Sequence, residues 1–158
     1  MIGILLYATT TRPNIMHSVC QVGRFQEYPK AFHLLAVKII FRYLKGTTEY
    51  GLWYPEGKQL DLYAFTDADW AGCIDDRKST SGATFFLGGC LVSWSSKKQS
   101  TVSLSTTEAE YIVATNCGAQ VVWMKQMLED IQIHYDTPIP IYCDNTSVIS
   151  ISKNPVMH

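Results

Sequence analysis

The spacing of apolar residues changes near residue 50, and this change divides the chain into two parts. In the first part, apolar residues recur every three or four positions, which predicts two helices. The first is expected from Pro13 to about Gln26, and the second from Pro29 to a left-handed Gly46 just beyond its end. Residues 1–50 are therefore expected to form a helical hairpin. The apolar stripe of the second helix is Phe32, Leu35, Ala36, Ile39, Ile40 and Tyr43.

From residue 51 onward, the pattern is typical of strands. Two strands are expected at GLWY and LDLYAFTDA, separated by a turn at PEGKQ. Two further strands are expected at ATFFLGG and CLVSWSS, joined by a tight turn at Gly88 and Gly89. A long helix is predicted from Thr106 to Ile131. A short buried strand at IPIYC and a helix beginning at NTSVISIS follow it. This order predicts an α/β domain with a mixed sheet over 51–158.

Composition narrows the class of protein only slightly. A chain of 158 residues fits one domain, or one domain with a short appendage, and 47% apolar residues is ordinary for a globular protein. The net charge of −1 gives no sign of nucleic-acid binding, so such a surface would need local basic clusters. Five cysteines without metal-binding spacing indicate reduced thiols, and the apolar N-terminal run is too short to cross a bilayer. We expect an intracellular protein that does not contact a membrane.

Two glutamates on the long helix have different expected roles. Ser105 and Glu108 form a capping box, in which Glu108 is expected to accept a hydrogen bond from the amide of Ser105. Glu110 lies beside the apolar face of the helix and is expected to point toward the sheet. A buried carboxylate is costly without a partner. The alternative is that Glu110 lies at the edge of this face and reaches water.

Two aspartates follow predicted strands. Asp67 lies at a strand end and shares a face with Tyr63 and Phe65, but Asp69 shares that face as well, so alternation leaves the choice between them open. Asp144 lies between a strand and a helix. It fits either the N-cap of that helix or a functional residue at a strand end.

The motifs FTDADWAG, DDRKSTSG, SWSSKKQ, STTEAEY and CDNTSVI occur in this order along the chain. Together they resemble the ribonuclease H domain of copia-type long-terminal-repeat retrotransposon Pol polyproteins. TRPNI and FRYLKGTTEYGLWY resemble the segment that connects reverse transcriptase to ribonuclease H in those polyproteins. The resemblance implies a helical connection segment at 1–50. It also implies a ribonuclease H-like fold at 51–158, with a mixed five-stranded sheet in complete members.

The resemblance also implies a metal-dependent endoribonuclease that degrades the RNA strand of RNA–DNA hybrids during reverse transcription. Asp67, Glu110 and Asp144 fall on its catalytic acidic positions and would bind two Mg²⁺ ions, with Mn²⁺ as the alternative. Hard oxygen ligands suit these ions, so the cysteines are interpreted as packing residues. The implied partners are the hybrid and the reverse transcriptase domain of the same polyprotein, and the implied location is a cytoplasmic virus-like particle or the nucleus.

Relative to the family pattern, the sequence ends before the last strand, the last helix and a fourth acidic residue. The alternative function is therefore a catalytically inactive nucleic-acid-binding or assembly remnant of such a polyprotein.

Polar residues near the acidic positions are candidates for substrate contacts. Hydroxyl groups suit the 2′-hydroxyls of RNA, and basic groups suit phosphates. Each candidate also fits a plainer role in a turn, a helix cap or a solvated surface. Trp70 and Trp94 are expected in the core rather than stacked on bases. The candidate substrate-binding residues are Arg77, Ser79, Thr80, Ser81, Lys97, Lys98 and Ser105.

Overall fold

The computed structural model describes residues 1–154 and consists of two compact units, Met1–Pro55 and Glu56–His158. Each unit has its own hydrophobic core. Within residues 1–154, no helix combines the length and the apolarity that a membrane span requires.

The first unit contains more helix than the predicted hairpin. Its helices are α1 (Ile2–Ala8), the short 3-10 helix η1 (Pro13–Ile15), α2 (Met16–Gly23) and α3 (Ala31–Gly46). The additional helix is α1, which has no side-chain cap and contributes a fully buried leucine to the core. The core of this unit consists of Leu5, Ile15, Val19, Val37 and Ile40.

One detail of the predicted first half is wrong. Gly46 is the last residue of α3 rather than a left-handed residue beyond it, and Thr47 is the C-cap. Most of the apolar stripe of α3 faces outward, since Phe32 is 61% exposed and Ile39 is 55% exposed. The expected strand GLWY is also absent, because 51–55 has no regular secondary structure.

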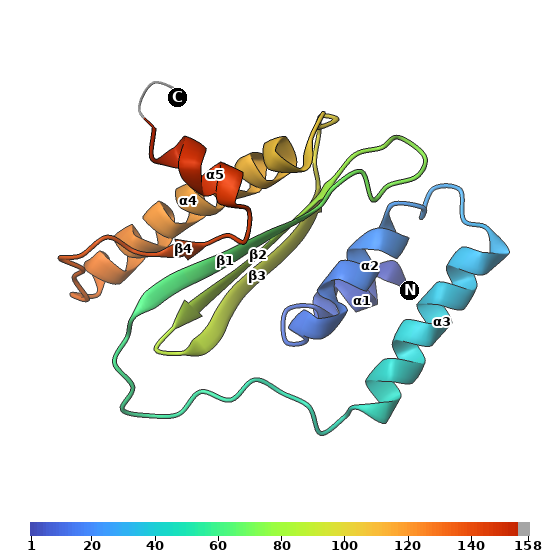
Figure 1. Ribbon diagram of the computed structural model, residues 1–158. Coiled ribbons are helices and arrows are strands. Elements are labelled where there is room, and N and C mark those ends of the chain that lie inside the picture. The colour runs from blue at the N-terminus through green and yellow to red at the C-terminus, as the bar shows by residue number, and fades with distance from the viewer. Residues whose placement is uncertain (155–158) are drawn as a thin grey trace. The chain divides into compact units, whose positions relative to one another are not determined.

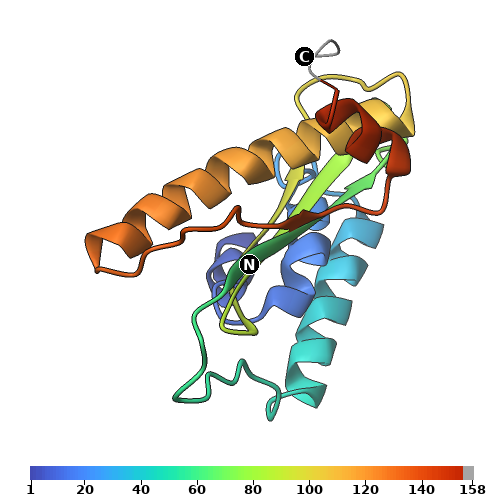
Figure 2. The same ribbon diagram turned by 60° about the vertical axis from the view of Figure 1, so that its left-hand side comes forward.

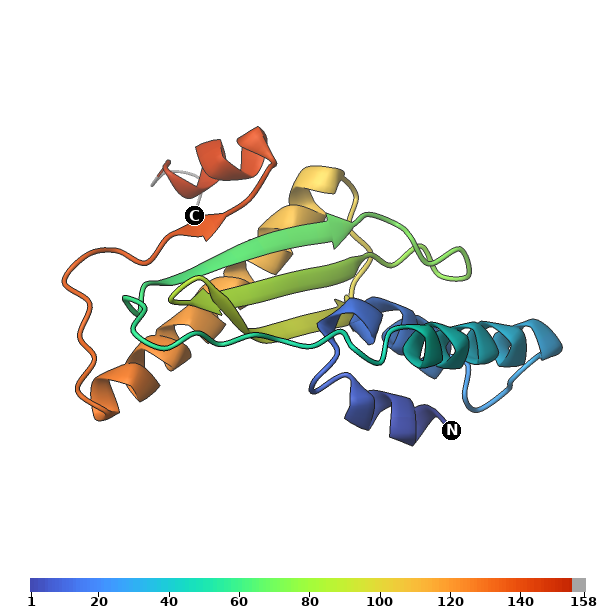
Figure 3. The same cartoon turned by 90° about the horizontal axis from the view of Figure 1, so that it is seen from below.

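The second unit contains a four-stranded mixed sheet, which confirms the predicted α/β class with a mixed sheet (Figure 1). Its strands are β1 (Leu62–Asp69), β2 (Thr80–Leu87), β3 (Cys90–Lys98) and β4 (Ile141–Tyr142). The order across the sheet is β3-β2-β1-β4, with β1–β2 and β2–β3 antiparallel and β1–β4 parallel. Figure 3 shows β1, β2 and β3 side by side, with β4 along the free edge of β1.

The predicted turn between β2 and β3 is present. Gly88 and Gly89 both have positive φ, 61° and 78°, in the region that glycine tolerates best. This tight reversal sets the antiparallel pairing of the two strands, apart from one bulge after Phe85.

The long helix α4 (Thr106–Asp130) covers one face of this sheet (Figure 2). The residues of β1 that face it are Leu62, Ala64 and Thr66, and all three are buried. Alternation sends Tyr63 and Phe65 to the opposite face. The core beneath α4 consists of Ala64, Phe85, Cys117 and Val121.

Hydrogen bonds at the start of α4 confirm the predicted cap and correct one detail. The Glu108 amide donates to Ser105 Oγ at 3.1 Å, so Ser105 is the N-cap. Glu108 Oε2 accepts from the amide of Leu104 at 2.7 Å, not from that of Ser105. After β4 the chain forms α5 (Thr146–Ser152), as predicted from NTSVISIS.

Candidate metal centre

The parallel pairing of β1 with β4 brings two aspartates to the same end of the sheet. Phe65 of β1 is paired with Tyr142 of β4. Asp67 and Asp144 each follow this pair by two residues, so both lie where the paired strands end. The sequence could not show this register, because β4 has only two residues.

Glu110 supplies the third carboxylate, from the first third of α4. Its side chain is buried, with 6% exposed, and no other acidic residue in 1–154 is buried. The Ala68 amide donates to Glu110 Oε1 at 2.9 Å, and the Cys143 thiol lies 4.0 Å from Oε2. The expectation that Glu110 points toward the sheet is therefore confirmed.

The charges of both aspartates act on Glu110. Burial raises the pKa of Glu110, and the negative charges of Asp67 and Asp144 raise it further, while the hydrogen bond from Ala68 opposes the shift. The side chains are therefore close enough for mutual repulsion. A divalent cation would relieve this repulsion, because it screens several carboxylates at once.

A tighter group lies within this acidic cluster. One ligand atom each from Glu110, Cys143 and Asp144 lies within 4.8 Å of the others. Asp67 is exposed and is not a member of this group. Cys143 is predicted from the sequence to be a packing residue, and the sequence signal for its place in this group is its position directly before Asp144.

The structure separates Asp67 from Asp69. The Asp69 carboxylate lies against Gly72, where a Cβ atom would be only 1.9 Å from Asp69 Oδ2. Asp69 is thus turned into the β1–β2 loop. Asp67 is the aspartate of β1 whose charge acts on Glu110.

Asp144 is not the cap of α5. Asn145 takes that role, because its Oδ1 accepts from the Val148 amide at 3.1 Å. The capping interpretation left open for Asp144 is therefore wrong, and its exposed carboxylate remains available for a ligand.

Two candidate substrate residues are too deeply buried to meet a polymer. Ser79 is fully buried, and its hydroxyl accepts from the Ala71 amide at 3.1 Å. Thr80 is 3% exposed. These residues position the β1–β2 loop and the start of β2, which corrects their assignment as direct contacts.

The other candidates lie at or near the surface. Arg77 is exposed and has a positive φ of 54° in the loop before β2. Lys98 Nζ is 2.7 Å from Asp76 Oδ2, and this hydrogen bond, helped by one from the Cys73 thiol, lowers the pKa of Asp76 to about 2. Ser105 caps α4. Ser81 and Lys97 line a groove on the α4 side of the sheet.

Trp70 joins two loops beside the acidic cluster. Its indole Nε1 donates to the Ser103 carbonyl oxygen at 3.1 Å, which links the β1–β2 loop to the β3–α4 loop. The ring is 45% exposed, so the expectation that Trp70 lies in the core is wrong. Trp94 is half-buried.

Comparison with known proteins gives matches to transposon polyproteins over nearly all of this chain. The chain is 47% identical over 158 residues to the "Retrovirus-related Pol polyprotein from transposon TNT 1-94" of Nicotiana tabacum, matching 99% of this chain and 12% of that protein. It is 42% identical to the "Retrovirus-related Pol polyprotein from transposon RE1" of Arabidopsis thaliana, over 100% of this chain and 11% of that protein. The chain thus spans about a tenth of the length of these polyproteins.

A shorter relative matches over most of its own length. The chain is 40% identical over 124 residues to the "Secreted RxLR effector protein 161" of Plasmopara viticola, covering 78% of this chain and 87% of that protein. No protein-family model matches the chain, and no solved structure matches it. At these identities and lengths, the chain belongs to a family whose members include the retrovirus-related Pol polyproteins of plant transposons.

Proposed function

We propose that the unit beginning at Glu56 is the ribonuclease H domain of a copia-type retrotransposon polyprotein. It would hydrolyse the RNA strand of RNA–DNA hybrids during reverse transcription, using two Mg²⁺ ions held by Asp67, Glu110 and Asp144. The observation that carries this proposal is the convergence of two carboxylates, Asp67 of β1 and Asp144 just after β4, on the buried Glu110 of α4.

The donor set fits Mg²⁺ or Mn²⁺. Carboxylate oxygens are the ligands these ions prefer, and a thiol is a poor ligand for Mg²⁺. Glu110 Oε1 is held by the Ala68 amide, which orients the carboxylate and leaves Oε2 directed toward Cys143. Asp67 and Asp144 are exposed, so their carboxylates can turn toward an ion.

When bound, divalent ions stabilise the charge that develops on the attacking and leaving oxygens of a phosphodiester. The chain's own contribution is to fix the carboxylates at the end of a rigid sheet. Trp70 and Ser79 hold the adjoining loops in place through their hydrogen bonds. Exposed Arg77 and Lys97 would bind phosphates of the substrate.

The first unit would adjoin the reverse transcriptase domain of the same polyprotein. Outward-facing apolar side chains on α3 are Phe32, Leu35 and Ile39, each more than half exposed. Such a stripe is typical of a surface that another domain covers. Replacing Leu35 and Ile39 with glutamate should abolish co-purification with a separately expressed reverse transcriptase region, and retained association would overturn this assignment.

The test is cleavage of a hybrid carrying a labelled RNA strand by the purified full chain. We expect Mg²⁺-dependent cleavage of the RNA that EDTA abolishes, with no cleavage of a DNA duplex of the same sequence. Asp67→Asn should lower the rate about a thousandfold or more, because metal ligands contribute several kcal/mol to the transition state.

Asp69→Asn is the matched control, because Asp69 lies on the same strand but is turned into the loop. It should stay within a few-fold of the wild type. Equal losses in the two variants would contradict the assignment of Asp67. A folded chain that binds the hybrid without cutting it would favour the alternative, an inactive nucleic-acid-binding remnant.

A further inference from the structure

The Cys143 thiol adjoins two of the carboxylates of the acidic cluster. Cys143 directly follows β4 and directly precedes Asp144. Its Sγ lies 4.0 Å from Glu110 Oε2, and one ligand atom each from Glu110, Cys143 and Asp144 lies within 4.8 Å of the others. The cluster therefore contains a sulfur ligand that the proposed Mg²⁺ ions do not use.

The two oxygens of the Glu110 carboxylate have unequal partners. Glu110 is 6% exposed, and Oε1 accepts a hydrogen bond from the Ala68 amide at 2.9 Å. In residues 1–154, the Cys143 thiol is the only hydrogen-bonding group in contact with Oε2, and a thiol is a weak donor. A buried carboxylate oxygen without a strong donor is costly. Oε2 is thus directed at the sulfur in a position where a cation would compensate its charge.

The three ligand atoms are close to the arrangement that Zn²⁺ requires. Zn²⁺ binds thiolate sulfur at about 2.3 Å and carboxylate oxygen at about 2.0–2.2 Å in a tetrahedron, which places its ligand atoms about 3.3–3.5 Å apart. From the observed 4.8 Å, closure needs a shift of about 1.5 Å at most. Asp144 is exposed and Cys143 is half-buried, so both can rotate toward the fixed Glu110.

Sulfur and oxygen ligands select different ions. A thiolate favours Zn²⁺, whereas Mg²⁺ prefers carboxylates and water. Asp67 is not a member of the group of three, so a zinc ion would use Cys143 where the proposed Mg²⁺ ions use Asp67. Because Glu110 and Asp144 are common to both ligand sets, occupancy by Zn²⁺ and occupancy by Mg²⁺ exclude each other.

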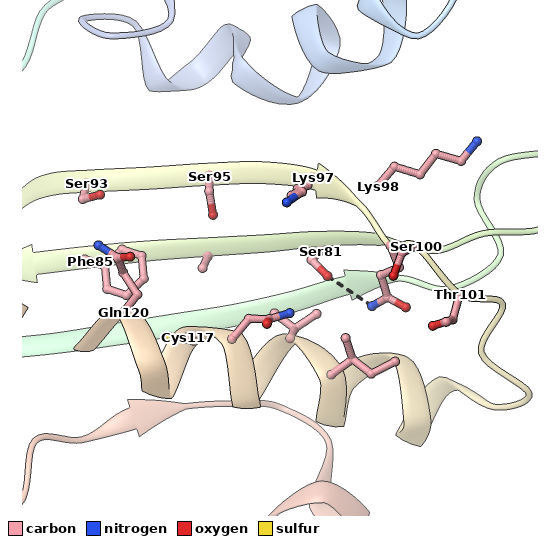
Figure 4. A pocket seen from close by; sticks show the side chains of 15 residues that line it. Ser81, Phe85, Ser93, Ser95, Lys97, Lys98, Ser100, Thr101, Cys117 and Gln120 are labelled. Carbon is pink, nitrogen blue, oxygen red and sulfur yellow. Dashed lines mark hydrogen bonds between the residues drawn. The ribbon is translucent and has the colours of Figure 1, made fainter. Parts of the chain in front are cut away.

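The other cysteines lack such a setting. Cys117 is 2% exposed and lines a groove between α4 and β3 in which no side chain is acidic (Figure 4). Cys73 neighbours one carboxylate, that of Asp76, which is already paired with Lys98. Among the residues that the structure describes, Cys143 is the only cysteine in a group of three possible metal ligands.

We propose that Glu110, Cys143 and Asp144 form a Zn²⁺ site that excludes Mg²⁺ from the acidic cluster. On binding, a zinc–sulfur bond forms and the thiol proton passes to solvent, with no change of oxidation state. Three protein ligands leave the fourth position of the tetrahedron to water. Zn²⁺ would thereby inhibit Mg²⁺-dependent cleavage. This inhibition rests on the proposed function, whereas the binding of Zn²⁺ does not.

The test is titration of the purified, reduced full chain with Co²⁺, in the absence of nucleic acid. Co²⁺ accepts the ligands of Zn²⁺ and gives a sulfur-to-metal charge-transfer band when a thiolate binds it. We expect this band to saturate at one equivalent and to disappear on addition of Zn²⁺, but not of equimolar Mg²⁺. Cys143→Ser should abolish the band and weaken Zn²⁺ binding at least about tenfold, because it removes one of three protein ligands.

Cys90→Ser is the matched control, because Cys90 is equally half-buried but lies at the start of β3. It should retain the band and the affinity. Asp67→Asn should also retain the band, which separates this site from the proposed Mg²⁺ site. A wild type without the band, or a folded Cys143→Ser variant that keeps it, would overturn the proposal.

Cleavage of the RNA–DNA hybrid then tests the exclusion of Mg²⁺. Zn²⁺ should inhibit the wild type, excess Mg²⁺ should relieve the inhibition, and Cys143→Ser should need at least about tenfold more Zn²⁺ relative to its own uninhibited rate. Saturation of the band without inhibition of a cleaving enzyme would refute the exclusion.

Zinc binding and nuclease activity fail separately. A Cys143-dependent band in a chain that does not cleave the hybrid would refute the nuclease and leave the zinc site standing. Mg²⁺-dependent cleavage without the band would refute the zinc site and leave the nuclease standing.

Discussion

The backbone amide of Ala68 donates to Glu110 Oε1 at 2.9 Å, which ties the buried carboxylate of α4 to the residue that follows Asp67. One hydrogen bond thus sets the distance between the helix and the end of the central strand. Burial and two neighbouring aspartates disfavour the charged form of Glu110. The hydrogen bond from Ala68 opposes both effects, because it stabilises the charged carboxylate.

Glu110→Gln should therefore stabilise the protein at neutral pH in the absence of divalent ions. The folded-state pKa of Glu110 lies above its ordinary value of 4.5, so the folded state binds more protons than the unfolded state between 4.5 and the raised pKa. Stability due to this group is present below pH 4.5 and is lost as pH rises through the folded pKa. Thermal unfolding across pH should show the variant above the wild type at neutral pH and the two converging below 4.5.

Glu108→Gln is the control, because its side chain caps the exposed start of α4 and a glutamine retains the acceptor. It should show no such gain. Mg²⁺ should raise the unfolding temperature of the wild type more than that of Glu110→Gln, because binding to the folded state alone is stabilising. If Glu110→Gln is less stable than the wild type at neutral pH, repulsion between Glu110 and the two aspartates is contradicted.

The sequence predicted the central sheet and its covering helix well, for identifiable reasons. The alternation through β1 and the Gly88–Gly89 pair specify the antiparallel strands, and Ser105 marks the start of α4. The capping box and the positions of the two residues around the helix distinguish Glu108 from Glu110 in the sequence alone. These signals are local, so one sequence suffices to detect them.

Features that depend on distant contacts could not be predicted. α1 has seven residues and no side-chain cap, and it is stabilised by Leu5, which is buried in the core of the first unit. α3 is apolar on more than one side, so its sequence did not reveal which side is buried. The position of Asp69 depends on Gly72 in the following loop, and Cys143 joins the acidic cluster only through the pairing of β4 with β1.

Gln99→Ala should destabilise the protein by about 2–3 kcal/mol. The substitution removes three hydrogen bonds from a buried side chain and leaves the Ser103 hydroxyl without its acceptor. Urea unfolding measures the change as a lower midpoint with an unchanged slope. Gln120→Ala, on the open groove side of α4, should change stability by less than about 0.5 kcal/mol. Equal effects of the two substitutions would show that the Gln99 network contributes little.

Alanine at Gly88 should cost more than alanine at Gly89. Both glycines have positive φ, so each substitution carries a penalty of about 1–2 kcal/mol. A Cβ at Gly88 would also lie 3.0 Å from the backbone oxygen of Gln59, whereas a Cβ at Gly89 meets no atom within 4 Å. Urea unfolding of the two variants provides the comparison, and a larger loss for Gly89→Ala would contradict the contact with Gln59.

Thiol alkylation should distinguish Cys143 from Cys117 and report on the metal centre. Cys117 is 2% exposed, and burial raises its pKa to about 11, so it should react with iodoacetamide only after unfolding in urea. Cys143 is half-buried beside Glu110 and should react in the native protein.

Mg²⁺ should slow this reaction, because an ion held by Glu110 and Asp144 blocks the approach to the neighbouring sulfur. Cys90, at the start of β3, is the control whose rate should not change with Mg²⁺. Mass spectrometry of the alkylated peptides measures all three rates. If the alkylation rate of Cys143 does not change at Mg²⁺ concentrations that support cleavage, the ion binds elsewhere.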